Sequence, residues 1–600
     1  MMKKTAPPVR TIDGRRFRNA FVAGTLALES RRTYLNSINV FPVPDGDTGD
    51  NMASTCRFII DRVEATGSIV STSAAMAEAA LEGARGNSGI ILTQFLYGLS
   101  RALENRDEVD AATLGKSLAE AIPHAEQAVH RPVEGTILTV MRDWTGNFEE
   151  SSRRQGDFAS LLKGSLEAAR ASLLDTPRNL EILAREHVVD AGAQGFVDFL
   201  QGVADFLEKG NLKDLRGNGP HVFPVETNEH GMDALPAYRY CAEAVVAGGR
   251  LSREDLVDEL EGYGDSIVVG GHEGKYRIHL HTSRPDDLFA RLAARAGLNV
   301  QKAEDMYRQV ETVRKGKRPT ALLTDSACDL PQELMDRYGI HMVPLKLSVG
   351  GNSYLDKVSI SPRRVYQLMQ DTDIPMTTSQ PGMSDFDRLY SLLGSHFDSV
   401  IAIHLSRALS GTWNASMKAA AGTEYSGSIR VIDSRTLCSA QGLIVLHAAR
   451  AIEQGKTAQQ VRDLIERTIP RTRIFVSLST LEYMVRGGRI RPLTGRIAGV
   501  LNLKPVITVD SEGRGAHFGR PGSERSNLRK MVETFENLQQ RRGLLDYAVV
   551  HAAAPEKAEK LAEELSSRSG LQPAYITEIS PVIGIHSGPG SVAVSLILED

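Results

Sequence analysis

The hydrophobic pattern of this 600-residue chain changes twice, and each change marks a different kind of fold. Up to about residue 210, apolar and alanine-rich residues recur with helical spacing. Between 235 and 312, isolated strands and helices are mixed. From 319 onward, short apolar strands alternate with helices, as in α/β proteins. We therefore expect a multidomain protein with an all-α domain at 1–212, a small α+β domain at 235–312 and a two-lobed α/β domain at 319–600, with a Gly/Pro/Asn-rich linker at 214–231.

Composition predicts a soluble globular protein. The chain is 42% hydrophobic and 24% charged, and its net charge of −4 lacks the basic excess of a nucleic-acid binder. The basic N-terminal segment has no apolar stretch behind it, and no apolar run reaches the roughly 20 residues that span a bilayer. Four scattered cysteines argue against a disulfide framework. We expect a cytoplasmic protein with at most peripheral membrane contact and no nucleic-acid partner.

Residues 40–51, VFPVPDGDTGDN, form an acidic loop before an expected helix. Asp45, Asp47 and Asp50 lie so close that their charges repel unless a cation lies between them. The EF-hand pattern does not fit, because its fifth position is Gly49. Mg²⁺ fits better, since it takes one or two carboxylates and uses water and phosphates as its other ligands. The acidic loop predicts phosphate chemistry, and the alternative is a turn capped by Asx side chains.

A second loop, GARGNSGIILTQ at 83–94, places Gly86, Asn87, Ser88 and Gly89 before an apolar helix. Backbone N–H groups at a helix N-terminus bind phosphate, although an ordinary helix cap explains the same pattern. No GxxxxGK[ST] motif occurs in the chain, so this is not a P-loop.

The middle region contains a candidate metal site. His279 and His281 stand two residues apart on an expected strand, and therefore on one face of it. Cys241 lies in another expected strand, which could pair alongside. Two histidines and a cysteine suit Zn²⁺ but lack one ligand. The alternative is two half-buried histidines and a core cysteine.

The C-terminal region has three polar motifs that could bind an anion. SRALSGTWNASM places Ser410, Gly411 and Thr412 at an expected helix N-terminus, which suits a carboxylate or phosphate. TTSQPGMSDF at 377–386 again puts hydroxyls before a helix. GIHSGPGSVAV is expected to place His586 in a glycine-rich turn between strands. Each motif alone is more typical of a helix cap or a tight turn than of a binding site.

Four segments in the first 200 residues carry a family resemblance: NVFPVPDGDTGDNM, ARGNSGIILTQ, VEGTILTV and VVDAGAQGF. They resemble the signature segments of the DhaL-type (Dak2) kinase domain, in the version found in the FakA component of bacterial fatty acid kinase. The resemblance implies a helical barrel in which Asp45 and Asp47 would hold two Mg²⁺ ions that bridge ATP phosphates. The family usually has threonine at the position of Asp50, where the extra charge could alter metal affinity or cap the helix.

The same resemblance implies a set of residues near the nucleotide. Asn39 stands near the place where other members have a third aspartate. The implied ATP-binding residues are Asn39, Thr48, Asn51, Asn87, Ser88, Thr136, Asp190 and Gly192.

The segments YCAEAVV, GDSIVVGG and HLHTSRP resemble the FakA middle domain, in which a cysteine and an HxH pair form a zinc site. The resemblance implies that Cys241, His279 and His281 would bind Zn²⁺. The role of such a site would be structural, or that of a relay between the flanking domains.

The last 280 residues resemble the DegV family through TDSACDLP, TSQPG, LSGTWNAS, VIDSRTLCSAQG, LEYMVRGGRI, LNLKPVI and HSGPG. This family includes the FakB partners of fatty acid kinase. The resemblance implies two α/β lobes that bury a fatty acid in a tunnel, with its carboxylate near the cleft. The implied carboxylate-binding residues are Thr378, Ser379, Ser410, Gly411, His586 and, by a looser match, Arg520.

Together these resemblances imply a fatty acid kinase with a built-in carrier domain. It would use ATP and Mg²⁺ to phosphorylate a fatty acid to acyl phosphate, and so feed exogenous fatty acids to phospholipid synthesis. We expect a homodimer by analogy, and an acyltransferase as a possible downstream partner. A fatty acid is ionised at pH 7 and already nucleophilic, so the protein must mainly neutralise two anions.

Two other functions stay open. One is a non-catalytic lipid-binding or regulatory DegV protein with a degenerate kinase half, against which the intact Asp45 and Asp47 argue. The other is a DhaL-type kinase of a small glycerone-like substrate. Kinases of that class usually need a separate domain that holds dihydroxyacetone covalently on a histidine, and no matching segment is found.

Overall fold

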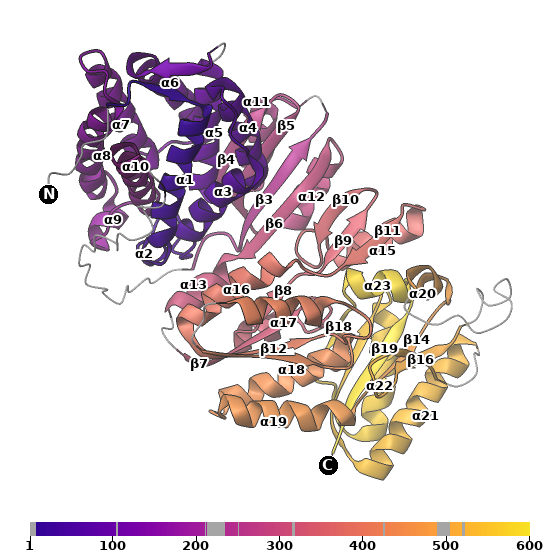
Figure 1. The fold of residues 1–600 in the computed structure, drawn as a ribbon. Coiled ribbons are helices and arrows are strands. Elements are labelled where there is room, and N and C mark those ends of the chain that lie inside the picture. The colour runs from indigo at the N-terminus through magenta and orange to yellow at the C-terminus, as the bar shows by residue number, and fades with distance from the viewer. Residues whose placement is uncertain are drawn as a thin grey trace. The chain divides into compact units, whose positions relative to one another are not determined.

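The computed structural model describes residues 8–103, 106–210, 212, 235–249, 251–314, 318–423, 427–488, 504–518 and 523–599. The chain divides into two compact units (Figure 1). The first comprises residues 1–284 with 292–314, and the second comprises 285–291 with 315–600. The predicted linker at 214–231 lies outside the described residues. The domain boundaries expected from the sequence stay predictions.

The N-terminal part of the first unit is helical, which confirms the expected fold class. One short antiparallel ladder joins β1 (Thr11–Asp13) to β2 (Glu108–Asp110). The helices are α1 (Gly14–Ser30), α2 (Arg32–Ser37), α3 (Thr48–Arg62), α4 (Ile69–Gly83), α5 (Gly86–Ala102), α6 (Ala111–Ala128), α7 (Ile137–Ser152), α8 (Phe158–Asn179), α9 (Glu181–Arg185) and α10 (Ala191–Lys209). Their apolar faces meet in one core, in which Leu28, Met52 and Phe148 are fully buried.

The rest of the first unit is built around a four-stranded antiparallel sheet of order β4-β5-β3-β6. The strands are β3 (Tyr240–Ala247), β4 (Gly264–His272), β5 (Lys275–Thr282) and β6 (Gly297–Asp305), and the helices are α11 (Arg253–Glu261) and α13 (Met306–Arg314). Helix α12 (Pro285–Ala293) follows β5 in the sequence, and its residues 285–291 are counted with the second unit. Ser252 and Asp255 form the capping box that begins α11. Val268 of β4 packs with Ala84 and Ile90, so the sheet lies against the helical part.

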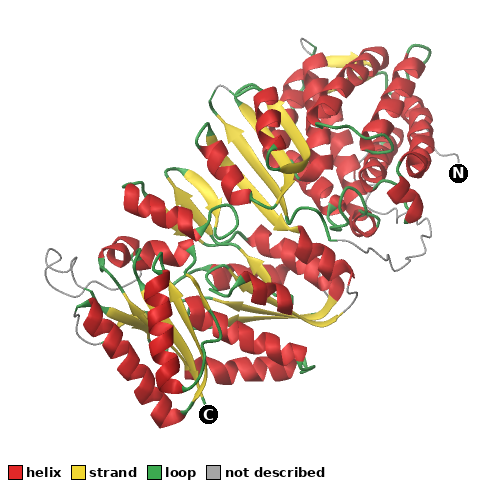
Figure 2. Cartoon of the chain, turned by 180° about the vertical axis from the view of Figure 1, so that it is seen from behind, coloured by secondary structure: helices red, strands yellow, loops and turns green. Residues whose placement is uncertain are grey.

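The second unit is an α/β structure, as expected for its fold class, and its described residues form three sheets; Figure 2 shows its mixture of helices and strands. The four-stranded parallel sheet, β13-β12-β7-β8, contains β7 (Arg318–Asp325), β8 (His341–Val343), β12 (Phe397–His404) and β13 (Ser428–Asp433). The six-stranded sheet, β16-β15-β14-β19-β17-β18, contains β14 (Thr472–Ser477), β15 (Val506–Val509), β16 (Gly515–His517), β17 (Leu544–His551), β18 (Ile576–Glu578) and β19 (Val592–Leu598). The three-stranded sheet, β10-β9-β11, contains β9 (Lys346–Val349), β10 (Asn352–Leu355) and β11 (Met376–Ser379).

Helix α18 (Cys438–Glu453) connects the two large sheets of this unit. Its buried residues share one core with Ile401 of β12 and with Ile474 of β14. The other helices are α14 (Gln332–Tyr338), α15 (Pro362–Asp371), α16 (Met383–His396), α17 (Thr412–Gly422), α19 (Ala458–Thr468), α20 (Glu482–Gly487), α21 (Glu524–Arg542), α22 (Pro555–Ser569) and α23 (Pro581–Ser587). The two sheets therefore belong to one continuous core rather than to separate domains.

Candidate functional site

The acidic loop is shaped by one buried amide. The Asn39 Nδ2 donates to the carbonyl of Val43 at 2.8 Å and to Asp45 Oδ1 at 3.2 Å. The Asn39 Oδ1 accepts from the N–H of Thr48 at 3.1 Å and from the Thr48 hydroxyl. Gly46 between the two aspartates has φ +69°, a left-handed conformation that glycine adopts without strain. Asn39 therefore holds Asp45 and Thr48 in place, whatever else it binds.

Asp50 does not share this arrangement. Helix α3 begins at Thr48, so Asp50 stands in its first turn. Its carboxylate accepts from Asn36 Nδ2 at 2.9 Å and lies 3.2 Å from Arg32 Nε, both on α2. These contacts assign Asp50 to the packing of α2 against α3.

Partial burial destabilises the ionised forms of Asp45 and Asp47. It raises the pKa of Asp45 well above its ordinary range, and the neighbouring Asp47 charge raises it further. Burial likewise raises the pKa of Asp47 to about 6. A divalent cation would reverse this penalty, because it stabilises the ionised form. The donor set therefore fits Mg²⁺.

Four helix N-termini converge beside this loop. Helix α5 begins at Gly86, so Asn87 and Ser88 belong to its first turn rather than to a loop before it. A Cβ on Gly86 would lie 2.7 Å from Asn51 Nδ2 of α3, and a Cβ on Gly192 of α10 would lie 2.6 Å from Ser88 Oγ. The N-terminal segments of α3, α5 and α10 are thus in direct contact. A side chain larger than that of glycine would clash at Gly86 and at Gly192.

Asp190 connects the fourth N-terminus to this group. It caps α10 through a 2.8 Å bond from the N–H of Ala193, and it also accepts from the N–H of Ile137, next to Thr136 at the start of α7. Burial raises the pKa of Asp190 to about 6. Asn87 Oδ1 is buried without a hydrogen-bond partner among the described residues. Helix N-termini that lie this close together are a favourable environment for phosphate groups.

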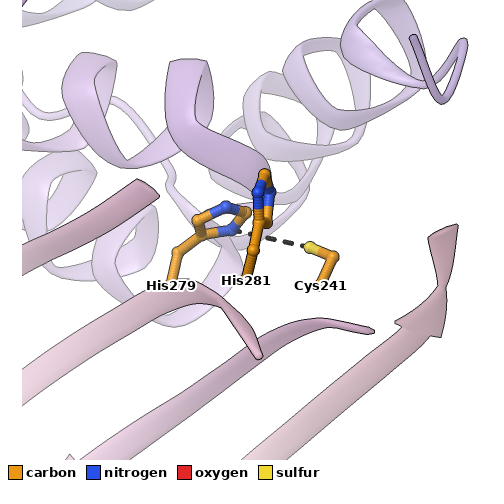
Figure 3. A group of neighbouring side chains, drawn as sticks. All are labelled: Cys241, His279 and His281. Carbon is orange, nitrogen blue, oxygen red and sulfur yellow. Dashed lines mark hydrogen bonds between the residues drawn. The ribbon is translucent and has the colours of Figure 1, made fainter. Parts of the chain in front are cut away.

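The predicted metal ligands of the middle sheet lie together (Figure 3). Cys241 faces His281 across β3 and β5, and His279 lies two residues away on the same face. The three ligand atoms are within 4.8 Å of one another, and Cys241 Sγ is 3.7 Å from His279 Nδ1. Tetrahedral zinc with ordinary bond lengths would separate a sulfur and a nitrogen by about 3.6 Å. Burial lowers the pKa of His279 and so favours the neutral ring that binds metal.

The same face carries charged residues that sequence reasoning missed. Glu243 of β3 is fully buried, and it lies 2.7 Å from Arg277 Nη2 and 3.5 Å from His279 Nδ1. It also accepts a 2.8 Å hydrogen bond from the N–H of Gly86, the first residue of α5. Burial raises the pKa of Glu243, but Lys302 and its other cationic neighbours outweigh burial and hold the pKa well below its ordinary range. The two-residue spacing from Cys241 was the signal that could have placed Glu243 on this face.

A cavity of about 460 Å³ lies within the second unit. Apolar side chains from several elements line most of it, among them Leu345, Leu405, Ile474, Ile507, Val582 and Ala593. The polar residues on its wall include the predicted Thr378, Ser379, Ser410, Gly411 and His586, together with Gln380. Such a cavity suits a ligand with a long apolar part and one polar group.

The polar part of the cavity brings separate segments together. Thr378 Oγ1 lies 3.4 Å from His586 Nε2, and Ser410 Oγ lies 2.9 Å from Thr412 Oγ1. A Cβ on Gly411 would lie 1.7 Å from Gln380 Oε1, so glycine permits this close approach. The prediction of a turn at His586 was wrong, because Pro581 opens a short helix that continues to Ser587. Arg520 lies outside the described residues.

No helix in the described part of the chain combines the length and the apolar character needed to cross a membrane.

Comparison with known families separates the chain into three matches. A family model for the DegV family matches residues 319–599, and a DAK2 domain model matches residues 42–205. A model for the FakA-like middle domain of fatty acid kinase matches residues 237–313.

Curated relatives match one half of the chain or the other. Protein YloV of Bacillus subtilis is 32% identical over 293 residues, which cover 47% of this chain and 53% of YloV. A Staphylococcus saprophyticus protein is 32% identical over 51% of this chain and 57% of its own length. The chain thus spans little more than half of these two relatives. A DegV domain-containing protein of Clostridium acetobutylicum is 30% identical over 46% of this chain and 97% of its own length.

Two solved structures resemble the second unit. A fatty-acid-binding DegV family protein from Thermus thermophilus is 31% identical, covers 47% of this chain and 100% of its own, and has a TM-score of 0.44. DegV from Bacillus subtilis, a fatty acid binding protein, is 28% identical over 47% of this chain and 99% of its own, also with a TM-score of 0.44.

Proposed function

The chain belongs to the DegV family, and because it also carries a DAK2 domain and a FakA-like middle domain, we propose that it is a fatty acid kinase. It transfers the γ-phosphoryl group of ATP to the carboxylate of a fatty acid held in its own cavity. The observation that carries this proposal is the apolar cavity with Thr378, Ser410 and His586 on its wall, in a chain that also has the acidic loop.

On the nucleotide side, Asp45 and Asp47 hold Mg²⁺, which shields the charge of the phosphates. Backbone N–H groups at the starts of α3, α5, α7 and α10 that are not already bonded to Asn39, Glu243 or Asp190 donate to phosphate oxygens. Asn39 keeps the acidic loop in shape. The further nucleotide-contacting residues that we propose are Thr48, Asn51, Asn87, Ser88, Thr136, Asp190 and Gly192.

On the acceptor side, the hydroxyls of Thr378, Ser379 and Ser410 and the N–H of Gly411 donate to the fatty acid carboxylate. His586 lies beside them and can share its proton with Thr378. The apolar wall holds the tail, and each buried methylene contributes about 0.8 kcal/mol. Arg520 stays a prediction from sequence alone.

The chemical step needs no general base, because a carboxylate is ionised at pH 7. One carboxylate oxygen bonds to the γ-phosphorus while the bond from that phosphorus to the β-phosphate bridging oxygen breaks, and ADP leaves. Catalysis rests on positioning and charge neutralisation. Joining carrier and kinase in one chain raises the effective concentration of the acceptor to about the millimolar range.

The acyl phosphate product is reactive, so we propose that an acyltransferase consumes it for phospholipid synthesis. A homodimeric state and a cytoplasmic location stay predictions from the sequence.

The deciding experiment is to incubate the purified chain with ATP, Mg²⁺ and oleate, and to trap acyl phosphate with hydroxylamine. We expect ADP and acyl hydroxamate in equal amounts. Lipid that co-purifies without turnover would favour the non-catalytic lipid-binding function. Turnover with glycerone but not with oleate would favour the small-substrate kinase.

We also propose that Cys241, His279 and His281 would bind Zn²⁺. The purified chain should contain about one zinc per molecule, and Cys241→Ala or His281→Ala should lose most of it. Elemental mass spectrometry measures this directly. Cys56→Ala is the control, because Cys56 is an equally buried cysteine in the helical part. Full zinc content in Cys241→Ala would contradict the assignment.

A further inference from the structure

The first unit buries a lysine between its sheet and its acidic loop. Lys302 of β6 is only 5% exposed, although lysine is rarely buried without a partner. Its Nζ lies 2.9 Å from Glu304 Oε2, 3.8 Å from Glu243 Oε1 and 3.5 Å from Asn51 Oδ1. The first two partners belong to the middle sheet, and the third belongs to helix α3, which follows Asp47.

The sheet holds this ammonium in place by itself. Lys302 is directly opposite Glu243 in the antiparallel register of β3 and β6, and Glu304 is two residues further along the same face. Glu243 is in turn fixed by Arg277 and by the N–H of Gly86. The position of Lys302 is therefore built into the fold, and does not depend on its attraction to the acidic loop.

This arrangement leaves the ammonium with unused donor capacity. Lys302 has three N–H donors, and among the described residues only Glu304 lies within 3.2 Å of Nζ. Arg277, the other buried cation of this face, donates from its two terminal nitrogens to Glu82 and Glu243, and its Nε has no hydrogen-bond partner among the described residues. Of these two cations, Lys302 is the one that contacts helix α3 next to the acidic loop, and its ammonium can donate to a further anionic partner there.

The place of Lys302 identifies that partner. Asn51 is in the first turns of α3, and Gly86 next to it begins α5, so the ammonium lies where the acidic loop meets two helix N-termini. Asp45 and Asp47 would hold Mg²⁺, whose chemistry in a kinase is to neutralise charge on the terminal phosphates. A cation at the position of Lys302 would therefore contact the γ-phosphoryl group, which is the group that is transferred.

We propose that Lys302 contacts the γ-phosphoryl group of ATP, so that the middle domain supplies a catalytic residue to the kinase site. Glu304 and Glu243 are its positioning residues. This inference rests on the proposed kinase function. Lys302 neutralises charge on the phosphoryl group during transfer, and no proton has to move.

The test compares two nucleotides in the full chain. Binding of ADP and of a non-hydrolysable ATP analogue is measured by calorimetry in the presence of Mg²⁺ for wild type, Lys302→Met and Lys302→Arg. Lys302→Met should weaken the ATP analogue by about 10- to 100-fold, the effect of one charged hydrogen bond, and ADP by less than about 3-fold. Lys302→Arg should restore much of the difference, and kcat should fall more than KM rises in Lys302→Met.

Lys302→Met leaves the Glu304 carboxylate without its cationic partner and could therefore misfold. A second variant controls for this effect. Lys302→Met/Glu304→Gln removes both charges, and its unfolding temperature should match that of wild type. It should keep the defect towards the ATP analogue. Equal weakening of both nucleotides, no weakening, or recovery in the double variant would each overturn the proposal, because Lys302 would then only balance the acidic residues.

The nucleotide comparison does not depend on the acceptor. If wild type binds both nucleotides but does not phosphorylate oleate, the proposed fatty acid kinase function fails while the role of Lys302 is still decided.

Discussion

Asp47→Asn is expected to reduce acyl phosphate formation from ATP and oleate by at least about 1000-fold, while fatty acid binding stays unchanged. The amide has the size of the carboxylate but cannot neutralise Mg²⁺, and the metal supplies several kcal/mol of charge stabilisation to phosphoryl transfer. The measurement is the hydroxylamine assay together with the lipid content of the purified variant.

Although Asp47→Asn should reduce activity, it should stabilise the folded state in the absence of metal. Burial raises the pKa of Asp47 from 3.8 to about 6. An acid with a raised pKa in the folded state destabilises that state as pH rises from about 4 to 6. At pH 7 without metal, Asp47→Asn should therefore increase the free energy of unfolding by up to about 3 kcal/mol. Added Mg²⁺ should stabilise wild type more than the variant.

Asp50→Asn is the matched control, since it makes the same chemical change three residues away. The Asp50 carboxylate contacts Arg32 and Asn36 and is about one third exposed. The free energy of unfolding should therefore decrease by no more than about 1 kcal/mol. Activity should stay within a few-fold of wild type. Full activity in Asp47→Asn, or an equal loss in Asp50→Asn, would refute the assignment of Asp47 to the metal.

Ala593→Phe should abolish stable fatty acid binding. Ala593 is fully buried on β19 and lines the cavity, so a phenyl ring there takes space from the lipid tail. Displacement of about four methylenes lowers affinity by about 3 kcal/mol, or roughly 100-fold. Native mass spectrometry of co-purified lipid and a titration with a fluorescent fatty acid measure the effect. Nucleotide binding should be unaffected.

Two further variants show whether Ala593→Phe loses lipid because the cavity is filled or because the core is disrupted. Val476→Phe fills the cavity from the neighbouring strand, where Val476 pairs with Ala593, and should have the same effect. Ala593→Ser keeps the volume and should retain lipid. Unfolding temperatures check for the 1–3 kcal/mol that overpacking costs when a ring does not fit. Wild-type lipid content in a folded Ala593→Phe would exclude this cavity as the lipid site.

Local spacing predicted the features that depend on neighbouring residues. The shared face of His279 and His281 follows from the two-residue period of a strand, and it is confirmed. Element ends were less accurate. Helix α5 begins at Gly86, and His586 lies in a helix, because a short segment takes its conformation from the structure around it.

The amino-acid sequence was sufficient for the fold classes, and it indicated which residues carry the chemistry, because carboxylates, hydroxyls and imidazoles act through their type and local spacing. The tertiary structure decided which of them meet. Glu243 receives its hydrogen bond from Gly86 across 157 positions of sequence, and Lys302 reaches Asn51 across 251. Such contacts depend on how the middle sheet packs against the helices, and no local period encodes that packing.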